Sequence, residues 1–255
     1  MCGIELSPKT EAFWNRVTKL AICLACGPAD LPLDEGVAGA SAAAEGNDRL
    51  QRRVDEVRRR FGDHAAEVAR RVGANERSIV SWHKGSNGES RLAAFIEREV
   101  GDFVLALHDR LIPGTRMNID HIWISPSGVW VVDAKSYKGK VVKRDVGRLW
   151  RSEFKVYVGG RDQSHLAKGV ETQIDAVLAA LQPDPAVKDT DVHAGMCFVD
   201  SDWRLLDFPF QVGTVWVLYP GALRKRLEKK GPLSRELMER IAKRLALSLP
   251  PATSS

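Results

Sequence analysis

Hydrophobic and polar positions alternate along the chain with two different periods, and the change of period outlines the elements of a main domain. In residues 86–100 the apolar positions are three or four apart, which predicts an amphipathic helix, and residues 163–181 repeat this spacing. Apolar runs rich in Ile, Val and Trp predict strands, at residues 103–108, 118–124, 129–135, 141–142, 155–158, 196–199 and 212–218. Two short helices are expected after them, at residues 221–230 and 234–247. This order predicts an α/β fold with a mixed central β-sheet flanked by helices.

The N-terminal part differs in composition and is expected to form a helical extension. A helix is predicted over residues 9–25, and the Gly, Pro, Ser and Ala of residues 27–46 are typical of a flexible linker. A second helix is predicted over residues 48–72, because its apolar residues recur every three or four positions. We therefore divide the chain into an N-terminal extension, a main domain and a C-terminal helix with its tail, at residues 1–75, 78–230 and 231–255.

The predicted helix at residues 48–72 carries many arginines outside its apolar stripe. One interpretation is a nucleic-acid-binding arm or a seam for self-association. The other is a solvated helix packed on the main domain. Interspersed Asp and Glu residues dilute the basic surface, which favours the second interpretation.

Composition narrows the class of protein only moderately. Hydrophobic residues make up 44% and charged residues 28% of the chain, as in ordinary globular proteins. The formal charge of +5 permits a polyanionic partner without requiring one. Four scattered cysteines do not form a disulfide framework, so we expect a reducing, cytoplasmic location. The sequence has no apolar run long enough to span a bilayer and no phosphate-binding P-loop, so we expect neither membrane insertion nor an ATP-driven motor.

A turn in the main domain fixes how two predicted strands face each other. Ser125-Pro126-Ser127-Gly128 has the residues of a type I turn. If Ser125 pairs with Gly128, counting outward from the turn along both strands places Asp120 opposite Asp133. Lys135 then lies on the same face as Asp133, because side chains alternate along a strand. His121 falls on the other face and is expected to be a packed core residue.

Two opposed carboxylates repel each other, and this repulsion needs an offsetting charge. A divalent cation provides it, since Mg²⁺ prefers oxygen ligands, and the Ala134 carbonyl could add one. Lys135 could then hold or deprotonate a water, or neutralise charge that builds on a phosphate. Alternatively, Lys135 bridges Asp120 and Asp133 as a purely structural ion pair. The spacing alone does not separate these two interpretations.

Several sequence pieces together resemble a known family. They are Gly88-Glu89, Asn118-Ile119-Asp120-His121, the turn with Val129, Val132-Asp133-Ala134-Lys135 and Gly139. In this order they resemble the nuclease-related (NERD) domain, a relative of the PD-(D/E)xK nucleases, over residues 78–230. The resemblance implies a restriction-endonuclease-like core that hydrolyses phosphodiester bonds of nucleic acid with Mg²⁺ or Mn²⁺.

The resemblance also implies roles for individual residues. Asp120 and Asp133 become metal ligands and Lys135 the catalytic lysine, with Asp133 standing where many relatives have Glu. Glu89 becomes the acidic residue of the first helix and Gln173 the polar residue of a later one. Glu89 is equally the last residue of a Ser86-x-x-Glu89 capping box, and Gln173 could be an ordinary surface residue.

The residues after Lys135 offer candidate phosphate contacts, namely Lys138, Lys140, Lys143 and Arg144. The alternative is an edge strand guarded by charge. At the level of the whole protein, the alternatives to a nuclease are a catalytically silent nucleic-acid-binding module and a protein-interaction module. The sequence does not distinguish DNA from RNA as the substrate.

Overall fold

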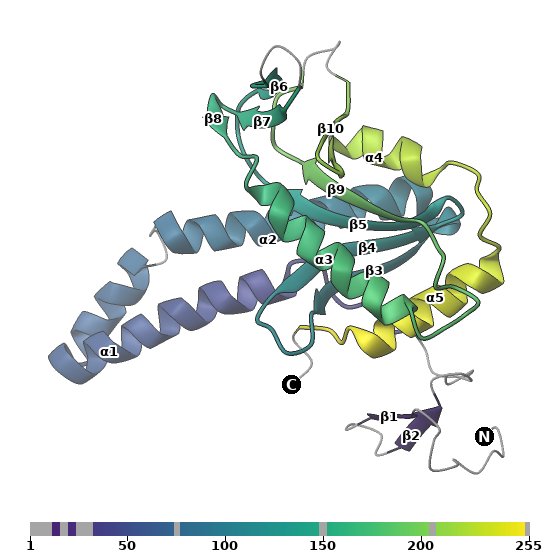
Figure 1. Cartoon of the computed structure of the whole chain (residues 1–255). Coiled ribbons are helices and arrows are strands. Elements are labelled where there is room, and N and C mark those ends of the chain that lie inside the picture. Colours follow the sequence, from purple (N-terminus) through teal and green to yellow (C-terminus); the bar gives the residue numbers. More distant parts are fainter. Residues whose placement is uncertain are drawn as a thin grey trace.

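A computed structural model gives the fold of the chain and describes residues 12–15, 20–23, 33–73, 77–147, 152–203 and 208–252. A six-stranded sheet forms its centre, with strand order β10-β11-β9-β5-β4-β3 (Figure 1). The strands are β3 (Leu105–Leu111), β4 (Asn118–Ser125), β5 (Gly128–Lys135), β9 (Val192–Phe198), β10 (Phe210–Val212) and β11 (Val215–Leu218). β3, β4 and β5 run antiparallel, whereas β9 is parallel to β5 and β11. The predicted mixed α/β fold is thereby confirmed.

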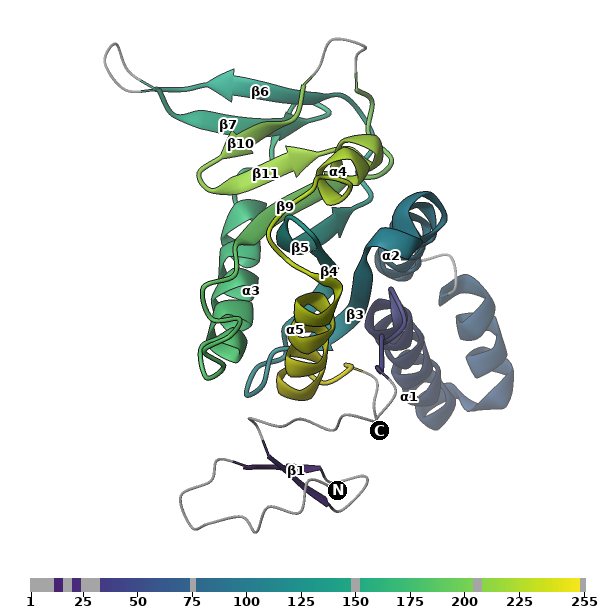
Figure 2. The same ribbon diagram turned by 90° about the vertical axis from the view of Figure 1, so that its right-hand side faces the viewer.

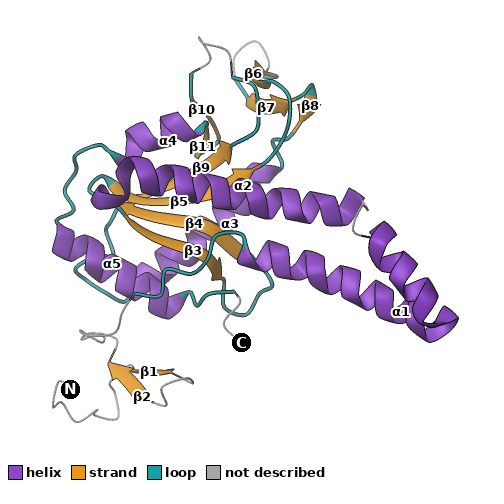
Figure 3. Cartoon of the chain, turned by 180° about the vertical axis from the view of Figure 1, so that it is seen from behind, coloured by secondary structure: helices purple, strands orange, loops and turns teal. Residues whose placement is uncertain are grey.

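Helices cover both faces of this sheet. α3 (Leu166–Leu181) and α5 (Arg235–Ser248) lie on one face, which is toward the viewer in Figure 1. The end of α2 (Arg77–Val100) and α4 (Pro220–Leu227) lie on the other, which Figure 3 shows from behind. Side chains of β5 alternate between the two cores: Val129 and Val131 pack under α3 and α5, and Trp130 and Val132 under α2 and α4. Both faces are therefore apolar, as expected of central strands that are covered on both sides.

A small three-stranded sheet lies beside the main one and is best seen in Figure 2. It consists of β6 (Val141–Asp145), β7 (Phe154–Val158) and β8 (Arg161–Asp162). Val141, Val156 and Val158 are buried against α3 and β9, which attaches this sheet to the core. The opposite face carries Arg144 and Lys155 beside Val142 and Tyr157, and most of it is half-buried.

α1 (Ala40–Gly73) and the first half of α2 form an antiparallel pair that projects from the domain (Figures 1 and 3). α1 is about 50 Å long at the usual rise per residue. Its arginines pair with acidic residues three or four positions away, including Arg52 with Asp48, Arg60 with Glu56 and Arg70 with Glu67. This mutual neutralisation agrees with a solvated helix. Among the helices that the structure describes, none is long and apolar enough to cross a membrane.

Three sequence-based predictions about the first hundred residues need correction. The helix predicted over residues 9–25 is wrong, because the structure has strands β1 (Ala12–Asn15) and β2 (Leu20–Cys23) there. Their aromatic and β-branched residues have high strand propensity, which outweighs the helical spacing. The linker predicted over residues 27–46 lies outside the described residues up to position 32, and its last seven residues belong to α1. A run of alanines gives that segment high helix propensity. α2 also begins nine residues before the predicted start.

Candidate active site

The register of the β4–β5 hairpin is the one that the turn predicts. Ser125 pairs with Gly128, and the ladder continues to His121 opposite Val132. It ends there, one pair short of Asp120 and Asp133. Beyond this point β4 stays paired with β3 and β5 stays paired with β9, so the two central strands part.

Asp120 occupies the fork between the strands. The Ala134 amide donates a hydrogen bond of 2.9 Å to Asp120 Oδ2, in place of a backbone carbonyl of β4. The side chain is thereby fixed, because a buried amide without a partner is costly. Asp120 and Asp133 are 9% and 6% exposed.

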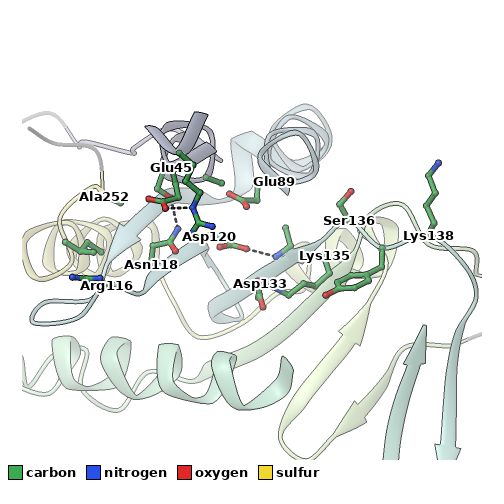
Figure 4. Close-up of a pocket in the computed structure, with 16 residues that line it drawn as sticks. Glu45, Glu89, Arg116, Asn118, Asp120, Asp133, Lys135, Ser136, Lys138 and Ala252 are labelled. Carbon is green, nitrogen blue, oxygen red and sulfur yellow. Dashed lines mark hydrogen bonds and ion pairs between the residues drawn. The ribbon is translucent and has the colours of Figure 1, made fainter. Parts of the chain in front are cut away.

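Lys135 and Glu89 complete the cluster (Figure 4). Lys135 Nζ donates to Asp133 Oδ1 at 2.6 Å, and its side chain is 22% exposed. Glu89 reaches the site from α2 and is buried. Its Oε2 atom has no hydrogen-bond partner among the described residues. Four ionisable groups from three elements thus meet at the fork.

Two carboxyl groups of the cluster, those of Asp120 and Glu89, have raised pKa values. Burial, and then the charges of Asp133 and Glu89, raise the pKa of Asp120 well above its usual range. Burial, and then Asp109 and Asp133, raise the pKa of Glu89 to about 7. Burial alone would lower the pKa of Lys135, but Asp133 and Asp120 outweigh it and raise that pKa. Ionisation of Asp120 and Glu89 is therefore unfavourable without a further cation.

The donor set fits a Mg²⁺ ion. Mg²⁺ is typically held by one or two carboxylates and several waters, and Asp120 and Asp133 offer such a pair. The amide and carbonyl of one strand residue point to the same side, so the Ala134 carbonyl faces the fork along with its amide. Across the parts of the chain that the structure describes, no three His, Cys, Asp or Glu side chains are assembled to hold a metal. The fit is thus that of two carboxylates and a backbone oxygen.

Glu89 is not a helix cap. α2 begins at Arg77, so the backbone amides near Ser86 lie inside the helix. Amides inside a helix donate to backbone carbonyls, and none is left to donate to the Glu89 side chain. The capping-box interpretation is therefore wrong. Glu89 instead accepts a hydrogen bond from the Gly39 amide, immediately before α1.

Gln173 is a buried residue of α3, so its interpretation as an ordinary surface glutamine is wrong as well. It is 6% exposed, and its Nε2 atom donates to the Asn118 carbonyl at 3.3 Å. Its Oε1 atom has no partner among the described residues. Gln173 thus contacts β4 two residues before Asp120, although it does not line the cavity described next.

A cavity of about 930 Å³ opens above the fork (Figure 4). Its lining includes the four ionisable groups and residues from α1, from the β3–β4 connection and from the segment after β5. The lining residues outside the cluster are Ser41, Ala42, Glu45, Arg49, Leu111, Arg116, Asn118, Ala134, Ser136, Tyr137, Lys138 and Ala252. The contribution of α1 to this cavity was not predicted from the sequence.

Asp109 is the residue that brings α1 to the site. It lies in β3 with a positive φ of 50°, a conformation that few residues other than glycine adopt. Its buried carboxylate accepts hydrogen bonds from the amide and hydroxyl of Ser41 and from the Asn118 side chain. Because Asp109 stands between His108 and Arg110 in β3, the local sequence carries no signal for this contact.

The predicted phosphate contacts divide into two groups. Lys138 is exposed and lines the cavity. Lys140 is partly buried and lies at the start of the small sheet. Lys143 and Arg144 are exposed on β6, where Lys143 lies 3.6 Å from the Phe154 ring centre and Arg144 lies 4.3 Å from that of Tyr157. Of these four residues, Lys138 alone lines the cavity above the fork.

His121 is a core residue, as predicted. It is fully buried and stacks on Trp123. Its Nδ1 atom lies 2.9 Å from Nδ1 of His108, a residue that the sequence did not place. Burial lowers the pKa of His108 to about 4, so this pair is neutral inside the protein.

Together, the mixed sheet and the acidic fork with its lysine form the core of an α/β domain. Residues 84–199 match the family model of the NERD, or nuclease-related, domain. The match confirms the resemblance to this family that the sequence predicted. The match includes Glu89, Asp120, Asp133 and Lys135 and leaves α1 outside it. Comparisons with curated proteins and with solved structures found no match.

Proposed function

We propose that the protein is a metal-dependent nuclease that hydrolyses phosphodiester bonds of nucleic acid through Asp120, Asp133 and Lys135. The observation that carries the proposal is the fork, where a nuclease-related domain holds buried, mutually repelling carboxylates beside a lysine. Such a cluster costs stability unless it serves a ligand.

Each side chain has a distinct part in the proposed reaction. The Ala134 amide holds Asp120 in place, and Asp133 holds the Lys135 ammonium at the cavity wall. A charged ammonium in a poorly solvated cavity stabilises the negative charge that develops on a phosphate during hydrolysis. The unpartnered oxygen of Glu89 can accept a hydrogen bond from a water molecule.

Asp120, Asp133 and the Ala134 carbonyl would hold Mg²⁺ or Mn²⁺, as the donor set indicates. When bound, such an ion offsets the carboxylate charge and polarises the phosphoryl group. Lys138 at the cavity, Lys140 just before β6, and Lys143 and Arg144 in β6 would bind neighbouring phosphates. Because these groups would bind phosphates, we propose nucleic acid, either DNA or RNA, as the partner.

The second candidate is a catalytically silent module that binds nucleic acid or protein on the same fold. The short Lys135–Asp133 ion pair favours it, because this pair gives the lysine a structural partner. Self-association through residues 48–72 also stays a prediction.

A cleavage assay separates these functions. Purified protein is incubated with single- and double-stranded DNA and RNA, with Mg²⁺, with Mn²⁺ or with a chelator. We expect cleavage only with metal. Lys135→Ala should abolish cleavage and leave metal binding, measured by calorimetry, largely intact, because an ammonium group is not a ligand. Asp133→Ala should abolish both.

Lys188→Ala provides the control, since Lys188 is exposed and lies outside the cavity lining. It should cleave like the wild type. Equal cleavage by Lys135→Ala would reveal a contaminating nuclease or a different site. Failure of the wild type to cleave any substrate would favour the silent module.

A further inference from the structure

We propose that Arg49 of α1 and Arg116 of the β3–β4 connection bind phosphates of the substrate strand, on the side of the site away from Lys138. This inference rests on the proposed nuclease function and deepens it. By this inference α1, which lies outside the residues that match the family model, forms one wall of the substrate site.

The first support is position. Arg49 and Arg116 line the same cavity as Asp120, Asp133 and Lys135. Figure 4 shows Arg116 with Glu45 at one end of this cavity, Lys138 at the other and the carboxylates between them. A strand whose scissile phosphate lies at Lys135 therefore has cations on both sides.

The second support is charge. Glu45 accepts a hydrogen bond of 2.6 Å from Arg49 Nε, and this bond, followed by the charges of Arg49, Arg52 and Arg116, lowers the pKa of Glu45. Arg52 also pairs with Asp48. Of these charged residues, Arg49, Arg116 and Glu45 line the cavity, and two guanidinium groups with one carboxylate leave this end with a net charge of +1. An arginine that a neighbouring carboxylate orients presents a planar set of donors suited to phosphate.

The third support is that α1 is tied to the catalytic strand. Ser41 donates to Asp109, which also accepts from Asn118, two residues before Asp120. The Gly39 amide, at the start of the same helix, donates to Glu89. Arg49 follows Ser41 by eight residues, or about 12 Å along the helix. Its distance from the site is therefore set by partly buried hydrogen bonds.

The simpler interpretation is that Glu45 and Arg49 form an ordinary surface ion pair. Such pairs stabilise helices only slightly. α1 contains a matched example, because Glu56 and Arg60 form the same four-residue pair at 3.0 Å, farther along the helix and outside the cavity lining. Arg60 is thus the control for Arg49.

The test measures binding without cleavage. A fluorescently labelled single-stranded DNA oligonucleotide is titrated with the full chain in chelator, and anisotropy is followed at several salt concentrations. Arg49→Ala and Arg116→Ala should each weaken binding by about tenfold, as loss of a charged hydrogen bond does. Each should also lower the slope of log affinity against log salt by about 0.7. Arg60→Ala should bind like the wild type.

Glu45→Gln gives a test of sign. If Arg49 binds phosphate, removing the neighbouring negative charge should strengthen binding. If Arg49 only pairs with Glu45, breaking the pair from either side should leave binding at the wild-type level. Melting temperatures check that each variant is folded.

The binding assay tests the role of Arg49 and Arg116, and the cleavage assay tests the nuclease proposal separately. Equal binding by Arg49→Ala, Arg116→Ala and Arg60→Ala would overturn the inference and leave wild-type cleavage untouched. Absence of binding by the folded wild type would overturn it too, and the cleavage assay would then judge the nuclease proposal on its own. Weaker binding by both cavity variants, with tighter binding by Glu45→Gln, would support it.

Discussion

The Asp120 carboxylate accepts a hydrogen bond from the Ala134 amide, but its negative charge is unfavourable in this buried site. A substitution can remove the charge and keep the hydrogen bond. Because the folded-state pKa of Asp120 is raised, its ionised form destabilises the fold above the unfolded pKa. Asp120→Asn removes the charge and keeps an oxygen that can accept from the Ala134 amide. We expect this variant to melt no lower than wild type without metal and to lose the Mg²⁺-induced rise in melting temperature.

Differential scanning fluorimetry with and without Mg²⁺ measures both effects. A clear loss of stability without metal would instead identify Asp120 as part of a structural ion pair with Lys135.

His108 and His121 predict how stability responds to acid. Burial lowers the pKa of His108 to about 4 and that of His121 well below its usual range. A histidine with a depressed folded-state pKa contributes stability above its unfolded pKa of about 6.5, and this stability is lost as the pH falls. We expect the urea midpoint to drop between pH 6.5 and pH 4, and His108→Gln to flatten that drop. An unchanged pH profile in His108→Gln would contradict this origin.

Residues of the site were predictable where local rules apply. The turn residues set the register, and alternation along a strand then put Asp120, Asp133 and Lys135 on one face. Glu89 and Asp109 obey no such rule, since their surroundings come from segments far away in the chain. The Ser86-x-x-Glu89 pattern even favoured a cap, because nothing local shows that α2 starts at Arg77.

At the scale of elements, the glycines of the α4–α5 connection and of α3 should respond oppositely to substitution. A Cβ atom at Gly231 would meet the Pro126 carbonyl and the Ser127 backbone, where the connection crosses the β4–β5 turn. Gly231→Ala should therefore lower the free energy of unfolding by about 1–3 kcal/mol.

Gly169 is the matched control for Gly231, because a Cβ atom there meets nothing within 4 Å. Gly169→Ala should raise the stability by about 0.5–1 kcal/mol, since it lies inside helix α3. Denaturant unfolding measures both changes. Equal effects of the two substitutions would show that the contact with the turn does not limit packing.

Elements were predictable in type more often than in extent. β4, β5 and α3 follow clear periodicity and lie close to their predicted positions. α1 and α2 extend well beyond theirs, because packing of one helix on the other stabilises turns that lack a strong apolar pattern. For β1 and β2 the predicted type of element was wrong, because four-residue segments are too short for the spacing of their apolar residues to decide between helix and strand.

At the scale of the whole molecule, sequence patterns gave the class of fold but not the way distant parts meet. Alternating helices and strands predicted the layers, and the family match confirms the domain at their centre. The docking of α1 on the cavity depends on Asp109 and Ser41, which are 68 positions apart. Contacts of this kind are tertiary, and no window along the chain contains them.

The cavity is lined by both Ser41 and Ala252, and the Ala252 amide donates to the Asp109 carbonyl. Segments that are more than 200 residues apart in the sequence therefore meet at the same wall. During synthesis the ribosome releases the chain from its N-terminus, so α1, the acidic fork and the lysine all emerge before Ala252 does. The wall is therefore finished only once Ala252 has emerged, and a nascent chain that stops before this residue lacks part of the surface that would hold a substrate.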